Sequence, residues 1–220
     1  METETGVEYG EGMGRRPATY ADLEALPANV VGELIAGELY ASPRPAAPHT
    51  VAASRLGGEL IGPFDRGRGG PGGWILLYEP ELHLGEDVLV PDFCGWRRER
   101  MPQPPRTAAF TLAPDWVCEV LSPSTRALDR SVKLPVYARE GVRHVWLVDP
   151  EARTLEVFRL EGARYSLVVT HSGPVHVRAE PFEALELELP FLWGEEQGGG
   201  TRRGSTAPCL FILVMSLTQK

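Results

Sequence analysis

Two acidic side chains interrupt apolar segments that have the length and composition of β-strands. Glu119 lies in the segment 115–121, and Asp92 lies in the segment 88–94. A carboxylate among apolar neighbours is costly unless it is paired or binds a metal. One such residue is as consistent with an ion pair to an arginine as with a functional site. Two carboxylates on neighbouring strands, with Lys133 shortly after the second, have the chemistry to hold a hard divalent cation, because such cations prefer oxygen ligands.

The pattern within the two segments predicts how these carboxylates are presented. Alternate side chains share one face of a strand, so Glu119 is expected beside Val117 and Leu121. The segment around Asp92 is predicted as one strand. Pro91 in that segment cannot donate a hydrogen bond to a neighbouring strand, which predicts a sheet edge or a bulge next to Asp92.

Lys133 lies in a predicted helix that follows a turn at 122–125. It comes one helical turn after Asp129 and one before Tyr137, and a surface ion pair with Asp129 is the simplest interpretation of its charge. A strongly apolar strand is predicted next, at 142–148. The order strand, helix, strand predicts a crossover connection between parallel neighbours in one sheet.

The N-terminal half adds further polar candidates. A β-hairpin is predicted at 33–40, with Glu33 and Glu38 flanking its turn, and two solvated carboxylates are the simplest interpretation. A helix is predicted from His49 to about residue 61. His49 is then either an ordinary residue of the helix N-terminus or a contact for a substrate phosphate.

Arginines form local basic clusters in an otherwise acidic chain. These arginines are either solvated surface charges or contacts to a nucleic-acid backbone. Contacts to the backbone carry little information about base sequence. The members are Arg97, Arg98, Arg100 and Arg106 in a proline-rich loop, and Arg126 and Arg130 near the predicted helix.

Length and composition bound the remaining expectations. The 220 residues suffice for one domain with tails, predicted at 19–193 between disordered segments 1–18 and 194–220. The formal net charge of −8 argues against a generally basic nucleic-acid-binding surface but permits a local basic groove. The three cysteines have no metal-binding spacing, which favours a reducing, cytoplasmic setting. No signal peptide is recognised, and the apolar run 209–217 is too short to span a bilayer.

Common catalytic motifs are absent from the sequence. It contains no GxGxxG after a strand, no GxxxxGK[ST], no GxSxG and no HExxH. The four predicted C-terminal strands extend the sheet or form a β-rich lobe. Their expected positions are 155–160, 165–170, 175–178 and 185–189.

The order of several short motifs resembles that of the Uma-two family of bacterial restriction-endonuclease-like proteins, within the PD-(D/E)xK nuclease superfamily. The likeness covers about residues 19–193 and is most specific from Glu119 to Pro150. The matching segments are Glu33 to Leu39, Ser42-Pro43, Pro48-His49, Val90-Pro91-Asp92, Glu119 to Thr125, Asp129 with Lys133-Leu134-Pro135, Tyr137, Gly141-Val142, and Val145 to Pro150.

This resemblance implies a mixed α/β fold with a restriction-endonuclease-like core, in which helices flank a mixed central sheet and extra strands follow. It assigns Asp92 and Glu119 as ligands of Mg²⁺, with Mn²⁺ as a substitute. The superfamily lysine normally stands two positions after the second acid, where this chain has Leu121. The resemblance moves that role to Lys133, which requires the helix to cross the strand ends. Glu33 matches the additional N-terminal acid, with Glu38 as the competing choice.

The function implied by the resemblance is Mg²⁺-dependent hydrolysis of DNA phosphodiester bonds by an activated water. Asp92, Glu119, Lys133 and Glu33 are the predicted catalytic residues. Arg97, Arg98, Arg126, Arg130 and His49 are the predicted substrate contacts. A homodimer is expected, since symmetric dimers are the commonest oligomers. The alternatives are a nuclease-fold module that binds DNA or protein without catalysis, and a hydrolase of RNA or another phosphoester.

Overall fold

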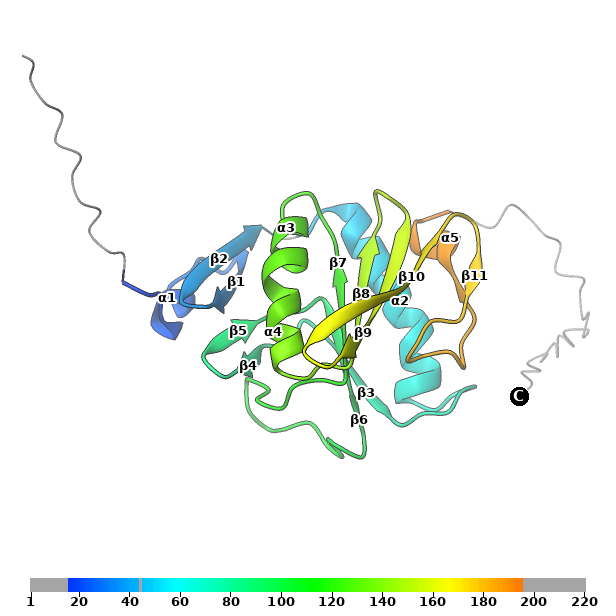
Figure 1. Cartoon of the computed structure of the whole chain (residues 1–220), viewed down its shortest axis with the longest axis horizontal. Helices are drawn as coiled ribbons and strands as arrows, with labels where there is room; N and C mark the ends of the chain where they lie inside the picture. Colours follow the sequence, from blue (N-terminus) through cyan, green and yellow to red (C-terminus); the bar gives the residue numbers. More distant parts are fainter. Residues whose placement is uncertain (1–15, 44, 196–220) are drawn as a thin grey trace, which may run out of the picture.

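The computed structural model describes residues 16–43 and 45–195, which form a smaller and a larger β-sheet (Figure 1). The predicted tails, 1–18 and 194–220, lie almost entirely outside the described residues. Within the described ranges, no helix has both the length and the apolar character needed to cross a bilayer.

The smaller sheet is antiparallel, with the strand order β2-β1-β5-β4. Its strands are β1 (Val30–Ile35), β2 (Glu38–Pro43), β4 (Leu82–Leu84) and β5 (Asp87–Leu89), and helix α1 (Tyr20–Glu24) precedes them. Ala36 and Gly37 connect β1 to β2 with φ values of 52° and 76°. Positive φ at both central residues is the conformation that a two-residue hairpin requires. The predicted hairpin is confirmed.

The larger sheet is mixed, with the strand order β10-β9-β8-β7-β6-β3. Its strands are β3 (Trp74–Tyr78), β6 (Phe93–Arg97), β7 (Trp116–Val120), β8 (His144–Asp149), β9 (Thr154–Glu161) and β10 (Arg164–Ser172). Strands β7 and β8 are parallel and the other pairs are antiparallel. The crossover between β7 and β8 is therefore confirmed.

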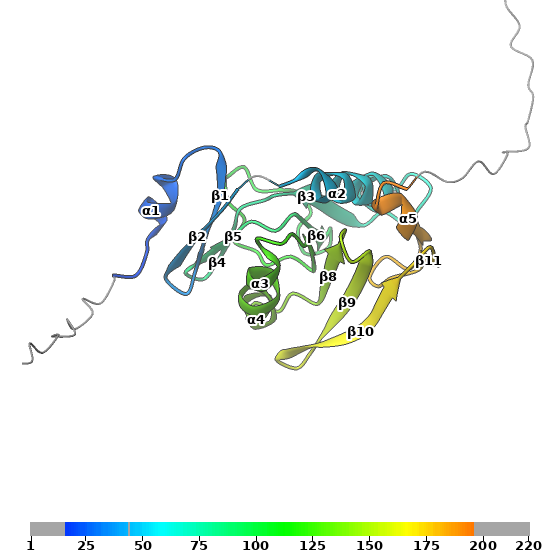
Figure 2. The ribbon, with the colours of Figure 1, turned by 90° about the horizontal axis from the view of Figure 1, so that it is seen from above.

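Helices cover both faces of the larger sheet (Figure 2). Helix α2 (Ala47–Leu60) packs on one face with the C-terminal segment, and both contribute to a core that includes Trp116 and Val120. On the other face lies a helical segment made of α3 (Arg126–Leu128), a π-helical turn (Asp129–Lys133) and α4 (Leu134–Arg139). Its core includes Val117 and Leu121. The alternation predicted for β7 is confirmed, and it places Glu119 on the face of this helical segment.

The segment 88–94 corrects the prediction of one continuous strand. β5 ends at Leu89 in the smaller sheet, and β6 begins at Phe93 in the larger sheet. The three residues between them carry the chain from one sheet to the other. Pro91 explains the break, because it cannot donate a hydrogen bond to a neighbouring strand. Asp92 consequently lies at the junction of the two sheets.

The C-terminal segment closes the sheet face that carries α2. The short pair β11 (His176–Val177) and β12 (Leu187–Glu188) leads into α5 (Leu189–Leu192). Phe182 lies between β11 and β12 in the chain. Its fully buried ring contacts two tryptophans of the larger sheet, Trp116 and Trp146, edge to face. This aromatic cluster forms the centre of the α2 side of the core.

Candidate functional site

A cavity lies where the two sheets, the N-terminus of α2 and the start of α3 meet. Four acidic side chains line it together with one lysine and one histidine. The acidic residues are Glu33, Asp92, Glu119 and Asp129, and Glu79 is a fifth acidic residue in the same lining; the lysine is Lys133 and the histidine is His49. Prolines and hydroxyl-bearing residues complete the wall. Acidic groups therefore outnumber cations in a partly enclosed space.

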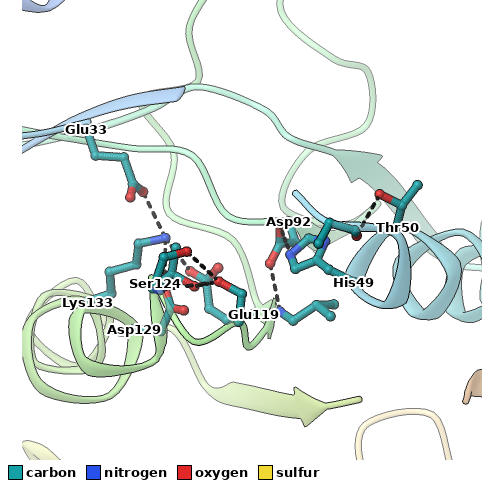
Figure 3. Close-up of polar contacts among 12 residues, drawn as sticks. Glu33, His49, Thr50, Asp92, Glu119, Ser124, Asp129 and Lys133 are labelled. Carbon is teal, nitrogen blue, oxygen red and sulfur yellow. Dashed lines mark hydrogen bonds and ion pairs between the residues drawn. The ribbon is translucent and has the colours of Figure 1, made fainter. Parts of the chain in front are cut away.

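Lys133 lies at the centre of three buried carboxylates. Its Nζ is 2.9 Å from Glu33 Oε1, 3.2 Å from Asp129 Oδ1 and 3.3 Å from Glu119 Oε1. Figure 3 shows the lysine reaching from its helix toward Glu33 on the smaller sheet and toward Glu119 at the end of β7. The prediction that Lys133 returns to the strand carrying Glu119 is confirmed, and its pairing with Asp129 is buried instead of superficial.

The local helix geometry explains how Lys133 is positioned. Pro135 has no N–H, and its ring would clash with the carbonyl four residues earlier in a regular helix. The helix widens into a π-helical turn immediately before it, and the N–H of Leu134 donates to the carbonyl of Asp129. Pro135 then occupies the first turn of α4. Asp129 and Lys133 are the two ends of this widened turn, a type of irregularity that is frequent at functional sites.

Glu119 is held by two donors at the same oxygen. Tyr137 Oη donates to Glu119 Oε1 at 2.6 Å, and Lys133 Nζ lies 3.3 Å from that atom. Burial raises the pKa of Glu119 well above its ordinary value, although the charge of Lys133 acts in the opposite direction. The tyrosine and the lysine together fix the orientation of the carboxylate.

Burial and neighbouring charges also shift the pKa values of the other members of the cluster. Burial raises the pKa of Glu33 and of Asp129, against the opposing charge of Lys133. Burial alone would lower the pKa of Lys133, but the surrounding carboxylates raise it well above its ordinary value. Lys133 is therefore an ammonium ion at neutral pH, while the carboxylates around it hold their protons more tightly than free ones.

Asp92 is fixed by one backbone group and one side chain. The N–H of Val120 donates to Asp92 Oδ2 at 2.7 Å, and His49 Nε2 lies 3.0 Å from Asp92 Oδ1. Burial lowers the pKa of His49, but the hydrogen bond and the charge of Asp92 outweigh this effect and leave the pKa raised. Nδ1 of His49 is buried and has no hydrogen-bond partner among the described residues. His49 lines the cavity, and its contact with a substrate phosphate stays a prediction.

The choice between Glu33 and Glu38 follows from their positions in the hairpin. Glu33 is buried, and its Oε1 accepts a hydrogen bond of 2.8 Å from the N–H of Val90. Glu38 is exposed on β2 and does not line the cavity. The structure brings Glu33 to Lys133 and leaves Glu38 outside the cluster.

The four arginines predicted to contact substrate do not line the cavity. Arg97 and Arg98 lie at the end of β6 opposite Asp92. Each arginine instead has a partner elsewhere: Arg97 stacks on Trp74, Arg98 pairs with Asp65, Arg126 with Asp149, and Arg130 with Glu156. Contact between these arginines and a DNA backbone outside the cavity stays a prediction.

Several cavity residues were not predicted as part of the site. Asp129 lines the cavity, and Tyr137 donates a hydrogen bond to the lining residue Glu119; their spacing of four residues on either side of Lys133 was the available signal. Glu79 follows β3 with a φ of 45°, which is uncommon for a residue other than glycine. The hydroxyls of Ser122 and Thr125, 3.0 Å apart, stand at the start of α3. Neither Glu79 nor the pair Ser122 and Thr125 belongs to a repeating pattern in the sequence that would have predicted its position in the site.

The side chains that line the cavity can be compared with the ligands that a divalent cation prefers. Carboxylate oxygens are the protein ligands preferred by Mg²⁺, and Asp92 and Glu119 line one cavity with a net excess of acidic groups. In residues 16–43 and 45–195, no three acidic, histidine or cysteine side chains stand in a ready-made coordination geometry. The residue types and the charge balance fit such an ion, and Lys133 supplies the positive charge at the centre of the inner carboxylates.

Comparisons with known proteins agree with the resemblance and the fold predicted from the sequence. The family model "Uma2: Putative restriction endonuclease" matches residues 17–191. A solved structure described as a "putative nuclease belonging to DUF820 from Anabaena variabilis ATCC 29413" matches with a TM-score of 0.67 and 23% identity, over 81% of this chain and 98% of that chain. At this identity the likeness concerns the fold. No match was found among curated proteins.

Proposed function

The chain belongs to the Uma2 family of "putative restriction endonucleases", and from this premise we propose that it is an Mg²⁺-dependent endonuclease that hydrolyses DNA phosphodiester bonds. The observation that carries the proposal is the convergence of side chains from different elements on one cavity. Asp92 precedes β6, Glu119 ends β7, and Lys133 comes from the crossover helix with its Nζ 3.3 Å from Glu119. The mixed sheet and the nuclease-like fold support the same reading.

Asp92 and Glu119 are the residues that would hold the cation. When bound, Mg²⁺ polarises a phosphoryl oxygen and lowers the pKa of a bound water. Mn²⁺ takes the same oxygen ligands and is expected to substitute. The hydrogen bonds from Val120 to Asp92 and from Tyr137 to Glu119 orient both carboxylates before substrate binds. Such orientation limits the rearrangement needed during the reaction.

Lys133 and Glu33 have distinct proposed roles. The raised pKa of Lys133 keeps it protonated, so it acts as a hydrogen-bond donor and stabilises the negative charge that develops on the phosphoryl oxygens. Glu33 is suited to accept a proton from the attacking water, because burial raises the pKa of its carboxyl above the ordinary value and makes it a stronger base. Their contact of 2.9 Å places donor and acceptor at the same point of the cavity.

The test is cleavage of supercoiled plasmid and single-stranded DNA with Mg²⁺ or Mn²⁺. Asp92→Asn and Glu119→Gln remove a charge with little change in shape, and each is expected to lower the cleavage rate by at least about 100-fold, since even partners that only orient metal ligands contribute up to that much. Asp115→Asn is the matched control. Asp115 is also a buried aspartate, but it precedes β7 at the end opposite Glu119. Its variant should cleave like the unaltered chain.

Three results would contradict the proposal. If Asp92→Asn and Glu119→Gln preparations cleave as fast as the parent, the activity comes from a contaminant. If the parent binds DNA and cuts nothing with either metal, a non-catalytic module is the better description, and cleavage confined to RNA would change the substrate class. The homodimer stays a prediction, which sedimentation of the purified chain would check.

A further inference from the structure

A second groove adjoins the cavity on the side of α2. It shares Pro45, His49, Glu79 and Asp92 with the cavity. Its remaining lining is Thr50, Ala53 and Ser54 from α2 and Tyr78 from the end of β3. Figure 3 shows His49 and Thr50 on the side of Asp92 that faces away from Lys133. A ligand at Asp92 can therefore extend from the cavity into this groove.

Tyr78 gives the groove a fixed, accessible aromatic ring. It is 43% exposed, although it stacks on Phe93, its partner across β3 and β6, with ring centroids 4.4 Å apart and an angle of 21°. Phe93 in turn packs edge to face on the buried Trp116. The exposed ring is thus supported from below by the core, which restricts its movement.

The helix beside Tyr78 is shaped to receive it. Gly57 stands inside α2, where glycine costs roughly 1 kcal/mol relative to alanine. A Cβ at this position would lie 1.3 Å from the hydroxyl oxygen of Tyr78, so only glycine lets the tyrosine lie across the helix. The hydroxyl is 3.4 Å from the carbonyl oxygen of Ala53 and donates to it. The small side chains at positions 50, 53 and 54 leave the space next to the ring open.

The backbone links the ring to the proposed catalytic carboxylate. Glu79 follows Tyr78 directly, and its N–H donates to the carbonyl of Asp92 at 3.2 Å. Tyr78 therefore pairs with Phe93, the residue that directly follows Asp92, at the start of β6. This strand pairing sets the distance between the ring of Tyr78 and the proposed metal-binding carboxylate of Asp92.

We propose that the groove binds the base of the nucleotide next to the scissile phosphate, stacked on Tyr78, and that the substrate is consequently unpaired at the cut. The inference rests on the proposed nuclease function. Aromatic rings bind unpaired bases through their faces without regard to sequence. In a duplex both faces are covered by neighbouring bases, so a base must be single-stranded or extruded to reach the ring. Among the described residues lining the cavity and groove, only His49 and Lys133 are basic, which gives no row of arginines to grip a duplex.

The test measures binding of a fluorescein-labelled single-stranded oligonucleotide in Ca²⁺, alongside the corresponding duplex. Tyr78→Leu should weaken single-strand binding about tenfold or more, the range of one base–aromatic stack, and Tyr78→Phe should bind like the parent. Tyr20→Leu is the control, because Tyr20 is a similarly exposed tyrosine that contacts Glu81 outside both cavities. Urea denaturation of each variant excludes a loss of folding.

A second measurement varies the substrate and leaves the protein unchanged. An abasic nucleotide is placed at successive positions of the oligonucleotide, and one position should weaken binding to the parent but not to Tyr78→Leu. Equal binding of Tyr78→Leu and the parent, or binding of duplex as tight as that of single strands, overturns the inference. In either case the plasmid assay still decides the nuclease function. If no DNA is cut, the binding data alone decide whether the groove holds a base.

Discussion

Lys133→Met is expected to destabilise the fold by about 3–5 kcal/mol, the range for removing one partner of a buried ionic group. The lysine is almost fully buried, as are Glu33, Glu119 and Asp129, which it contacts. Methionine fills a similar volume but leaves three carboxylates without their shared cation. The expected loss therefore reflects uncompensated charge more than lost packing.

The destabilisation of Lys133→Met should depend on pH. Burial raises the pKa values of Glu33, Glu119 and Asp129, and removing the ammonium removes the main opposing influence. A folded state with raised carboxyl pKa values binds more protons than the unfolded state. The contribution of these groups to the free energy of unfolding is therefore fully present below the pKa values of the unfolded state. It is lost as pH rises through the pKa values of the folded state. The variant should be markedly more stable at pH 5 than at pH 8.

Urea denaturation of the parent and variant at both pH values measures this effect. Arg130→Met is the matched control, since Arg130 lies in the same π-helical turn and pairs with Glu156, but its side chain is 35% exposed. An exposed pair contributes at most about 1 kcal/mol. A loss for Lys133→Met no larger than that of the control, or one independent of pH, would show that the carboxylate cluster does not depend on the lysine.

Phe182→Ala is expected to cost about 3–5 kcal/mol of stability, as is typical for truncating a buried aromatic side chain. The ring of Phe182 is fully buried, with ring centroids 4.7–5.6 Å from those of Phe64, Trp74, Trp116 and Trp146. Alanine would leave a cavity between rigid indole and phenyl rings that cannot collapse onto it. Because this cluster lies on the sheet face opposite Glu119, cleavage per folded molecule should be unchanged.

Phe191→Ala provides the comparison for Phe182→Ala. Phe191 is 37% exposed, with the guanidinium of Arg55 over its ring, so its truncation should cost much less. Thermal and urea denaturation of both variants give the difference. Similar small losses for the two would mean that the C-terminal segment does not contribute to the main core.

Local sequence patterns predicted most of the fold because they report local physics. The hairpin turn, the alternation along β7 and the crossover to β8 follow from side-chain period and chain connectivity. The break between β5 and β6 was missed because an apolar run with an internal proline fits both an irregular strand and a passage between two sheets. Pro91 indicated an irregularity, but the partner strands were not readable from the segment itself.

The site was predicted in part for the same reason. Asp92, Glu119 and Lys133 stood out as charges at defined positions of apolar or helical segments, and the structure brings them to one cavity. The positions of the arginines relative to the cavity could not be predicted, because the sequence does not show in which direction a charged side chain points. Arg126 and Arg130 face acidic groups on Asp149 and Glu156, away from the cavity. Such pairings depend on tertiary neighbours that no local pattern encodes.

The passage of the chain between the two sheets has a consequence for how the cavity comes into being. Glu33 belongs to the smaller sheet, Asp92 to the linker, Glu119 to the larger sheet and Lys133 to the crossover helix. No local unit of structure holds more than a fragment of this set, and its members are separated by up to 100 positions along the chain. A nascent or partly unfolded chain therefore lacks the assembled group. Any hydrolytic chemistry that needs all four residues is withheld until the final tertiary structure has formed.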